Sequence, residues 1–259
     1  MQSPAIALEN VVKRFDDGAP VLDGVCLTVA PREFLTVIGA SGSGKTTLLR
    51  MINRLLDPTA GHIFVGGKET AAQDATALRR SIGYVFQEVG LFPHMTVAEN
   101  IAITPRLIGW TADRISARVS ELLVLVQLDD DYTDRYPHQL SGGQRQRVGL
   151  ARAIAASPDV VLMDEPFAAL DPLTRETLGR DYRRLHDELG ITTVMITHDV
   201  LEALTLADRI IVLSGGRVVA DDKPRDIIDN AHPYVAELMQ APRRHAQKIG
   251  QLFGSSESA

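Results

Sequence analysis

The nonapeptide GASGSGKTT, Gly39 to Thr47, constrains the fold of this chain more than any other stretch of its sequence. It follows the apolar run FLTVI, which is typical of a strand, and precedes TTLLRMINRLL, which has helical periodicity. Its glycines allow successive backbone N–H groups to converge on phosphate oxygens, while Lys45 reaches the outer phosphates and Thr46 offers a hydroxyl to Mg²⁺. A purely structural glycine-rich turn is the alternative, but a chance match in such a chain is expected in on the order of 1% of cases. A strand, a phosphate loop and a helix in this order predict an α/β fold.

Short apolar runs recur along the chain between segments with helical patterns. They are rich in Val, Ile and Leu, which is typical of a largely parallel sheet covered by helices on both faces. The runs are Phe34–Gly39, Ile82–Gln87, Val160–Glu165, Thr193–His198 and Arg209–Val219. The last run contains SGG between two strand-like pieces and predicts a hairpin. The N-terminal pieces AIALENVV and VCLTVA predict an additional antiparallel sheet.

The middle of the chain, from about Leu91 to Gln139, has mostly helical patterns. In TADRISARVSELLVLVQL, apolar residues fall on one helical face after a cap at Thr111 or Asp113. These apolar residues are Ile115, Val119, Leu122, Leu123 and Val126. The pattern predicts a helical insertion between two halves of the α/β core.

Composition argues against several classes of protein. The chain has 259 residues and a net charge of −6 with acidic and basic residues well mixed, which does not suggest a nucleic-acid binder. Cys26 is the only cysteine, so no internal disulfide can form, and its alternating neighbours in GVCLTV predict a small buried side chain. The N-terminus lacks the pattern of a signal peptide, and the longest apolar runs are too short to span a bilayer. We therefore expect a soluble, cytoplasmic chain that works at a membrane only through partners.

Polar residues stand at the ends of several apolar runs. Asp164 ends a buried apolar run, where a carboxylate is energetically costly unless it binds a cation. The pattern therefore predicts that Asp164 acts on Mg²⁺ and that Glu165, next to it, polarises the attacking water. Gln87 and His198 end two other runs, and each taken alone is equally typical of a solvated strand end or a structural residue. Phe15, in VVKRF, could stack on a base, although its spacing favours packing in the core.

The segment LSGGQ, Leu140–Gln144, predicts a helix that begins on a serine and two glycines. A helix N-terminus carries unpaired N–H groups and the positive end of the helix dipole. This segment is therefore a second candidate anion-binding site, in addition to the phosphate loop. The motifs follow one another as the phosphate loop, Gln87, LSGGQ, VVLMDEP, ALD (Ala169–Asp171) and His198. From about Ile6 to Val219, this order resembles the nucleotide-binding subunit of ATP-binding cassette (ABC) transporters. In that family two subunits enclose two ATP molecules head to tail, and the LSGGQ of one subunit faces the γ-phosphate held by the other. This arrangement would account for two phosphate-binding sites in one chain.

The resemblance implies a P-loop NTPase (RecA-like) core with an antiparallel β-subdomain and a helical insertion, and an ATPase that uses ATP and Mg²⁺. It implies the following catalytic roles: Lys45 on the outer phosphates, Glu165 as the general base, His198 as the switch histidine and Gln87 as the sensor of γ-phosphate and metal. Metal contacts are implied for Thr46, Gln87 and Asp164. Nucleotide contacts are implied for Phe15, Gly39, Ala40, Ser41, Gly42, Ser43, Gly44, Lys45, Thr46, Thr47, Gln87, Ser141, Gly142, Gly143, Gln144, Asp171 and His198. Phe15 thereby becomes the adenine-stacking aromatic, and Asp171 the cross-dimer residue, although AALD stands where many members have SALD.

The stretch QEVGLFPHMTVAENIAITPRLIGW, Gln87–Trp110, together with MINRLLDPTAGHIFVGG, is similar to the ATPase subunits of quaternary-amine or osmoprotectant importers, such as those for glycine betaine and choline. In that family this segment receives the coupling helix of the membrane subunit. The resemblance implies three partners: a second ATPase subunit in a head-to-tail homodimer on ATP, transmembrane permease subunits and an extracytoplasmic solute-binding protein. It implies no nucleic-acid partner and a place on the cytoplasmic face of the cell membrane. An ATPase of another ABC transporter, for amino acids or lipids, and a soluble non-transport ABC ATPase are the alternatives.

We expect an ABC ATPase domain over residues 1–221, with a helical subdomain at about 91–150 inserted in its core. Residues 222–259 would then form a short C-terminal extension. Several members of the importer family carry a pair of regulatory CBS domains after the ATPase, and this extension is too short for such a pair. That argues against gating by ionic strength through such domains.

Overall fold

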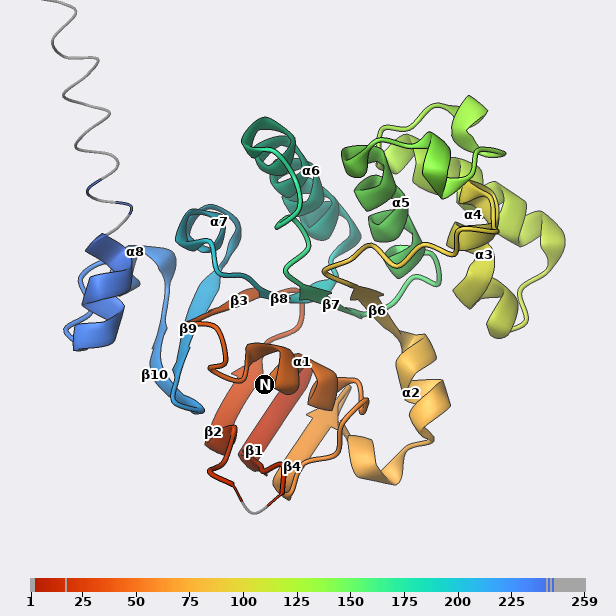
Figure 1. Ribbon diagram of the computed structural model, residues 1–259. Helices are drawn as coiled ribbons and strands as arrows, with labels where there is room; N and C mark the ends of the chain where they lie inside the picture. Colours follow the sequence, from red (N-terminus) through yellow and green to blue (C-terminus); the bar gives the residue numbers. More distant parts are fainter. Residues whose placement is uncertain (1–2, 17, 241, 243, 245–259) are drawn as a thin grey trace, which may run out of the picture.

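The computed structural model describes residues 3–16, 18–240, 242 and 244 (Figure 1). Its centre is a six-stranded sheet in the order β10-β9-β3-β8-β7-β6, in which β10 runs antiparallel to β9 and the other neighbouring pairs are parallel. The strands are β3 (Phe34–Ile38), β6 (Ile82–Val85), β7 (Val160–Asp164), β8 (Thr192–Ile196), β9 (Arg209–Ser214) and β10 (Arg217–Asp222). The largely parallel sheet and the hairpin of β9 and β10 confirm the predictions made from the apolar runs. Gln87 and His198 lie beyond the ends of β6 and β8, in the loops that follow.

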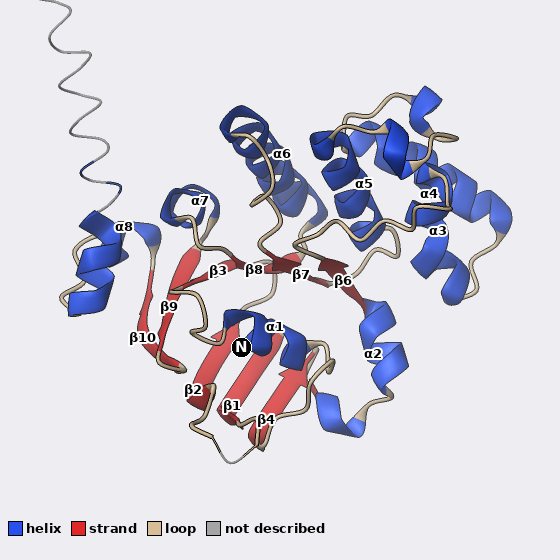
Figure 2. Ribbon diagram, viewed as in Figure 1, coloured by secondary structure: helices blue, strands red, loops and turns tan. Residues whose placement is uncertain are grey.

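A second sheet packs against the first, with α1 (Lys45–Ile52) between them (Figure 2). Its order is β2-β1-β4-β5, and all neighbouring strands are antiparallel. The strands are β1 (Ile6–Lys13), β2 (Leu22–Val29), β4 (Ala60–Val65) and β5 (Lys68–Glu69), and α2 (Ala75–Ser81) adds Leu78 to the shared core. This is the additional antiparallel sheet that the N-terminal pieces predicted.

Helices cover the opposite face of the six-stranded sheet (Figure 1). They are α5 (Gly142–Ile154), α6 (Pro172–Leu189) and α7 (Val200–Leu206), with α3 (Val97–Leu107) and α4 (Ala112–Leu125) packed on α5. Thr111 is the cap of α4, because its side chain accepts a hydrogen bond from the N–H of Arg114. All five apolar residues predicted to share a face of α4 are buried. In the part of the chain that the structure describes, no helix is both long and apolar enough to cross a membrane.

Successive side chains of the central strands point to opposite faces of the sheet. Leu35 and Val37 join the core around α1, whereas Phe34, Val161 and Met195 join the core beneath α5 and α6. Because both faces are covered, the strands carry apolar residues at nearly every position. The loops that follow the strands are thus supported by a sheet that is packed on both faces.

The C-terminal part of the described chain packs beside the β9–β10 hairpin. It contains α8 (Pro224–Ile227) and a further helical segment at residues 233–240. Ile227, Val235 and Met239 are buried in one apolar cluster with Val212 and Ile38. The cluster therefore reaches the last residue of β3, directly before the phosphate loop.

Cys26 is exposed, so the prediction of a buried cysteine is wrong. The strand alternates as predicted, but the buried positions are Val25 and Leu27, and this phase turns Cys26 outward. Its thiol donates a hydrogen bond to Oδ1 of Asn10 at 3.2 Å.

His186, on α6, is buried in the core of the protein. Its Nδ1 lies 3.0 Å from Oγ1 of Thr193 on β8. Burial lowers the pKa of His186, and the nearby charge of Arg183 acts in the same direction, against the carboxylates of Asp187 and Asp208. The folded protein therefore resists protonation of this ring.

We expect acid to destabilise the protein through His186. A histidine whose folded pKa is lowered leaves stability intact above its unfolded pKa of about 6.5, and stability is lost as the pH falls below that value because the unfolded chain binds the proton first. The free energy of unfolding, measured by chemical denaturation, should fall by up to ~1.4 kcal/mol per pH unit as the pH drops below about 6.5. His186→Gln should lack this component, while His138→Gln, at an exposed position, should keep it. Equal pH slopes in the wild type and His186→Gln would show that another group is responsible.

Candidate nucleotide-binding site

The glycine-rich loop connects the carboxyl end of β3 to the N-terminus of α1. Gly39 has φ +154°, and a Cβ at this position would collide with the carbonyl oxygen of Leu213. Gly44 has φ +101°, and a Cβ there would lie 2.7 Å from Cδ2 of Leu22. Both positions therefore require glycine, and they hold the loop against the protein with its backbone at the positive end of the α1 dipole.

Lys45 is the first residue of α1, and its side chain is buried. Its Nζ donates hydrogen bonds to the carbonyl oxygens of Gly39 and Ala40, both at 2.9 Å. Burial lowers the pKa of Lys45, and the carboxylates of Glu165 and Asp164 act in the opposite direction. A buried ammonium group at the base of this loop favours an anionic ligand.

Asp164 ends β7 and is buried. Its Oδ1 accepts a hydrogen bond from Oγ1 of Thr46 at 3.3 Å. Burial raises the pKa of Asp164, against the Thr46 hydrogen bond and the charge of Arg50. The fold thus brings a hydroxyl and a carboxylate together, and oxygen ligands of this kind suit a hard divalent cation.

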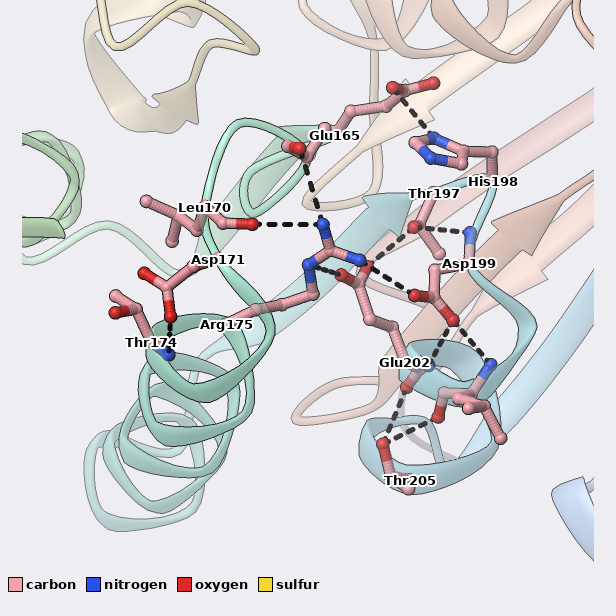
Figure 3. A network of polar contacts seen from close by, with 12 residues as sticks. Glu165, Leu170, Asp171, Thr174, Arg175, Thr197, His198, Asp199, Glu202 and Thr205 are labelled. Carbon is pink, nitrogen blue, oxygen red and sulfur yellow. Dashed lines mark hydrogen bonds and ion pairs between the residues drawn. The ribbon is translucent and has the colours of Figure 1, made fainter. Parts of the chain in front are cut away.

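Glu165 directly follows β7 and meets two side chains from other loops. Its backbone has φ +46°, which is uncommon for a residue other than glycine, and its N–H donates to the carbonyl oxygen of Ile196 at 3.0 Å. Its Oε2 lies 3.1 Å from Nδ1 of His198 (Figure 3) and accepts a hydrogen bond from Nε2 of Gln87 at 3.3 Å. The loops at the carboxyl ends of β6, β7 and β8 thus bring the side chains of Gln87, Glu165 and His198 into contact.

One cavity of about 690 Å³ lies between the phosphate loop and the side chains of Gln87, Glu165 and His198. It is lined by Phe15, Val21, Ser41, Gly42, Gly44, Lys45, Thr46, Thr47, Gln87, Glu165 and His198. All of them except Val21 are among the predicted site residues, and nothing in the local sequence marks Val21. Phe15 is 47% exposed, with Nζ of Lys13 5.1 Å from its ring centroid, so the preference for core packing drawn from spacing is wrong. Gly39, Ala40, Ser43 and Asp164 are not among the lining residues.

The segment Ser141 to Gln144 lies elsewhere, at the start of α5 (Figure 1). Ser141 is the N-cap: its Oγ accepts from the N–H of Gln144 at 3.2 Å, and Oε1 of Gln144 accepts from the N–H of Ser141 at 2.8 Å. The N–H groups of Gly142 and Gly143 lie outside this reciprocal pair. None of the four residues lines the cavity at the phosphate loop.

Asp171 also lies outside that cavity and caps α6. Its Oδ1 accepts a hydrogen bond from the N–H of Thr174 at 3.1 Å. Hydrogen bonds from the side chain and the N–H of Thr174 lower the pKa of Asp171. The side chain is exposed, so it is available to a second molecule.

Arg175, on α6, joins the loop before Asp171 to the loop after β8 (Figure 3). It donates to the carbonyl oxygen of Leu170 at 3.2 Å and to Oδ2 of Asp199 at 3.0 Å, and its Nε lies 3.6 Å from Oε1 of Glu202. Asp199 follows His198 directly, so Arg175 helps to hold the histidine loop in place. No sequence pattern identified this residue.

Comparison with known proteins gives the same assignment as the motifs. A family model described as ABC transporter matches residues 22–168. The choline transport ATP-binding protein OpuBA of Bacillus subtilis (strain 168) is 46% identical over 257 residues, which cover 96% of this chain and 68% of that protein. The glycine betaine uptake system ATP-binding protein YehX of Escherichia coli (strain K12) is 51% identical over 252 residues, covering 97% of this chain and 77% of that protein. The dimeric structure of a post-hydrolysis state of the ATP-binding cassette MJ0796 bound to ADP and Pi has a TM-score of 0.77 at 36% identity, covering 85% of this chain and 99% of that one.

The relatives differ in length and in named solute. The chain spans 60–68% of the length of the Bacillus subtilis and Listeria monocytogenes transport ATP-binding proteins that it matches. Sulfate/thiosulfate import ATP-binding proteins are 46–49% identical to it, so overall identity does not separate the solutes. The family itself is clear from the matched region, the identities and the geometry of the phosphate loop: the chain belongs to the ABC transporter family.

Proposed function

We propose that the chain is the ATP-hydrolysing subunit of an importer for a small quaternary-amine osmoprotectant such as glycine betaine or choline. The observation that supports ATP hydrolysis is that one cavity is lined by Lys45, Thr46, Gln87, Glu165 and His198. A phosphate loop and a carboxylate held by a glutamine and a histidine are the parts that phosphoryl transfer to water needs.

The residues of the loop fit ATP and Mg²⁺. Burial disfavours the charges of Lys45 and Asp164, and the hydroxyl of Ser43 is buried without a hydrogen-bond partner among the described residues. We propose that the loop N–H groups and Lys45 hold the phosphates, that Phe15 stacks on the adenine, and that the metal ligands are Thr46, Gln87 and Asp164. Bound Mg²⁺ would supply charge neutralisation at the transferring phosphoryl group.

Glu165 is the proposed general base. Its Oε2 is held by Gln87 and His198, which orients the carboxylate toward the cavity where an attacking water would lie. We propose that His198 also meets the γ-phosphate, as the switch histidine, and that Gln87 reports the presence of phosphate and metal to a partner.

A second copy of the chain would complete the site. Ser141, Gly142, Gly143 and Gln144 begin α5 away from the cavity of their own chain, with Ser141 and Gly142 exposed, and such a helix N-terminus favours an anion. We propose that it contacts the γ-phosphate bound by the phosphate loop of the second copy, in a head-to-tail homodimer, with Asp171 at the contact between the two chains. The related cassette MJ0796 is dimeric with ADP and Pi bound, which supports a site that involves two chains.

A transmembrane permease is the proposed occupant of a second cavity of about 660 Å³ that also contains Gln87. Phe86 and Phe92, which are 45% and 44% exposed, line it together with Arg79 and Arg152. Apolar rings and guanidinium groups at one exposed cavity are typical of a docking site for another protein. The chain would thereby be held at the cytoplasmic face of the membrane.

The domain boundaries remain as proposed from the sequence. We propose an ATPase domain over residues 1–221, with the helical subdomain at about 91–150, and a C-terminal extension over 222–259. The helical part begins beside the second cavity, so the same segment would carry both the permease contact and the ATP-contacting helix α5.

The experiment for this proposal is purification of the tagged chain from detergent-solubilised native membranes, with mass spectrometry of the copurifying proteins. A multi-span permease and an extracytoplasmic solute-binding protein are expected. The solute-binding protein is then titrated with glycine betaine, choline and sulfate, and we expect it to bind a quaternary amine. Binding of sulfate and of neither amine would contradict the proposed solute class. Recovery of soluble or nucleic-acid partners alone would contradict the proposal that the chain powers import.

A further inference from the structure

A tyrosine from the C-terminal part of the chain contacts the phosphate loop. The hydroxyl of Tyr234 accepts a hydrogen bond from the N–H of Ala40 at 2.7 Å, across 194 residues of sequence. Ala40 directly follows Gly39, at the start of the loop. Neither Ala40 nor Tyr234 lines the nucleotide cavity, so this contact supports the loop from outside the ligand space.

The same residue of the loop is held through its other backbone group. The carbonyl oxygen of Ala40 accepts hydrogen bonds from Nζ of Lys45 at 2.9 Å and from the N–H of Ser43 at 3.2 Å. Tyr234 and Lys45 thus hold the N–H and the carbonyl of one residue. Because Lys45 is the proposed phosphate ligand, the orientation of Ala40 affects where that ammonium group lies.

Apolar packing fixes Tyr234 in this position. The residue next to it, Val235, is fully buried, and Met239 one turn later is 2% exposed. Both belong to the cluster that contains Ile38, the residue before Gly39. The helical segment at 233–240 is therefore attached to the end of β3 by side-chain packing and to the loop by the Tyr234 hydroxyl.

We propose that Tyr234 is a positioning residue of the nucleotide site, through which the C-terminal segment sets the conformation of the phosphate loop. The inference rests on the proposed function, since it assigns Tyr234 to the ATP site named there. ATP affinity would then depend on the helical segment at 233–240, which follows β10.

Tyr234→Phe tests this, because it removes the hydroxyl and keeps the ring that packs. The loss of one hydrogen bond predicts a roughly threefold to tenfold rise in the Kd and KM for ATP, with kcat changed by less than about twofold. Amide hydrogen exchange of residues 39–44, measured on nucleotide-free protein, should accelerate. The thermal midpoint should fall by only a few degrees, since one hydrogen bond is lost and the ring remains in place.

Tyr182→Phe is the matched control. The Tyr182 hydroxyl lies 2.8 Å from Oγ1 of Thr193 in the core, away from the loop. We expect this variant to have a lower thermal midpoint and wild-type constants for ATP. Unchanged ATP constants and unchanged loop exchange in Tyr234→Phe would overturn the proposal, as would an equal rise in KM in Tyr182→Phe. If the wild type itself binds no ATP, the proposed function fails, and the exchange measurement still tests the loop contact.

Discussion

Glu165→Gln is expected to reduce the rate of ATP hydrolysis by roughly 10²- to 10⁴-fold, the range that a positioned general base contributes. Glutamine keeps the shape of the side chain and an oxygen for the contacts with His198 and Gln87, which are 3.1 and 3.3 Å in the native protein. It cannot accept a proton from water at neutral pH. Nucleotide affinity should persist, because the groups proposed to hold the phosphates are those of the loop and Lys45. Phosphate release and titration with a fluorescent ATP analogue measure the two quantities separately.

The control for this variant is Glu176→Gln, on the exposed side of α6. Glu176 forms an ion pair with Arg180 at 2.7 Å in which both side chains are more than 70% exposed, so its loss should change hydrolysis by less than about twofold. Hydrolysis by Glu165→Gln at the wild-type rate would show that another group activates the water. Loss of nucleotide binding in the same variant would show that Glu165 holds the nucleotide itself.

Ser141→Arg is expected to lower hydrolysis by at least about 100-fold while the affinity of a single chain for ATP stays within about threefold of the wild type. Ser141 is exposed at the start of α5 and does not line the cavity of its own chain. An arginine there would occupy the space into which the phosphates of the second copy must come. The measurement is ATP turnover beside nucleotide titration at protein concentrations low enough to keep chains apart.

Thr111→Arg separates this effect from the loss of a helix cap. Thr111 caps α4 as Ser141 caps α5, through a side chain that accepts from a backbone N–H three residues later. Each substitution should lower the stability of the protein by about 1 kcal/mol, and only the change at Ser141 should stop turnover. Loss of ATP binding by the single Ser141→Arg chain would place this serine in its own chain's site and contradict the two-copy arrangement.

The parts of the candidate site that sequence patterns predict are those that follow strands. Gln87 and Glu165 are 78 residues apart, and His198 is 33 residues from Glu165, yet each follows a strand of one parallel sheet. The carboxyl ends of parallel strands share an edge, so these residues meet once the sheet is predicted. The antiparallel sheet, the hairpin and the buried face of α4 followed from periodicity in the same way.

Other features depend on contacts that have no local signal. Alternation in β2 does not say which phase faces the core, which is why Cys26 was assigned to the wrong side. The apolar character of Phe15 does not distinguish a core side chain from the wall of a cavity. Arg175 contacts the carboxylate of Asp199, 24 residues away, and Tyr234 contacts the N–H of Ala40, 194 residues away. No pattern in the sequence around either residue marks such a contact.

The measurement that tests the central claim most directly is the molar mass of the Glu165→Gln protein in solution with saturating ATP and Mg²⁺, by light scattering after size exclusion. The account predicts twice the 28.2 kDa of one chain, and a return to the mass of one chain when Ser141→Arg is added to the same protein. A mass of one chain for Glu165→Gln with ATP bound would contradict it, because the nucleotide site would then be complete without the second copy.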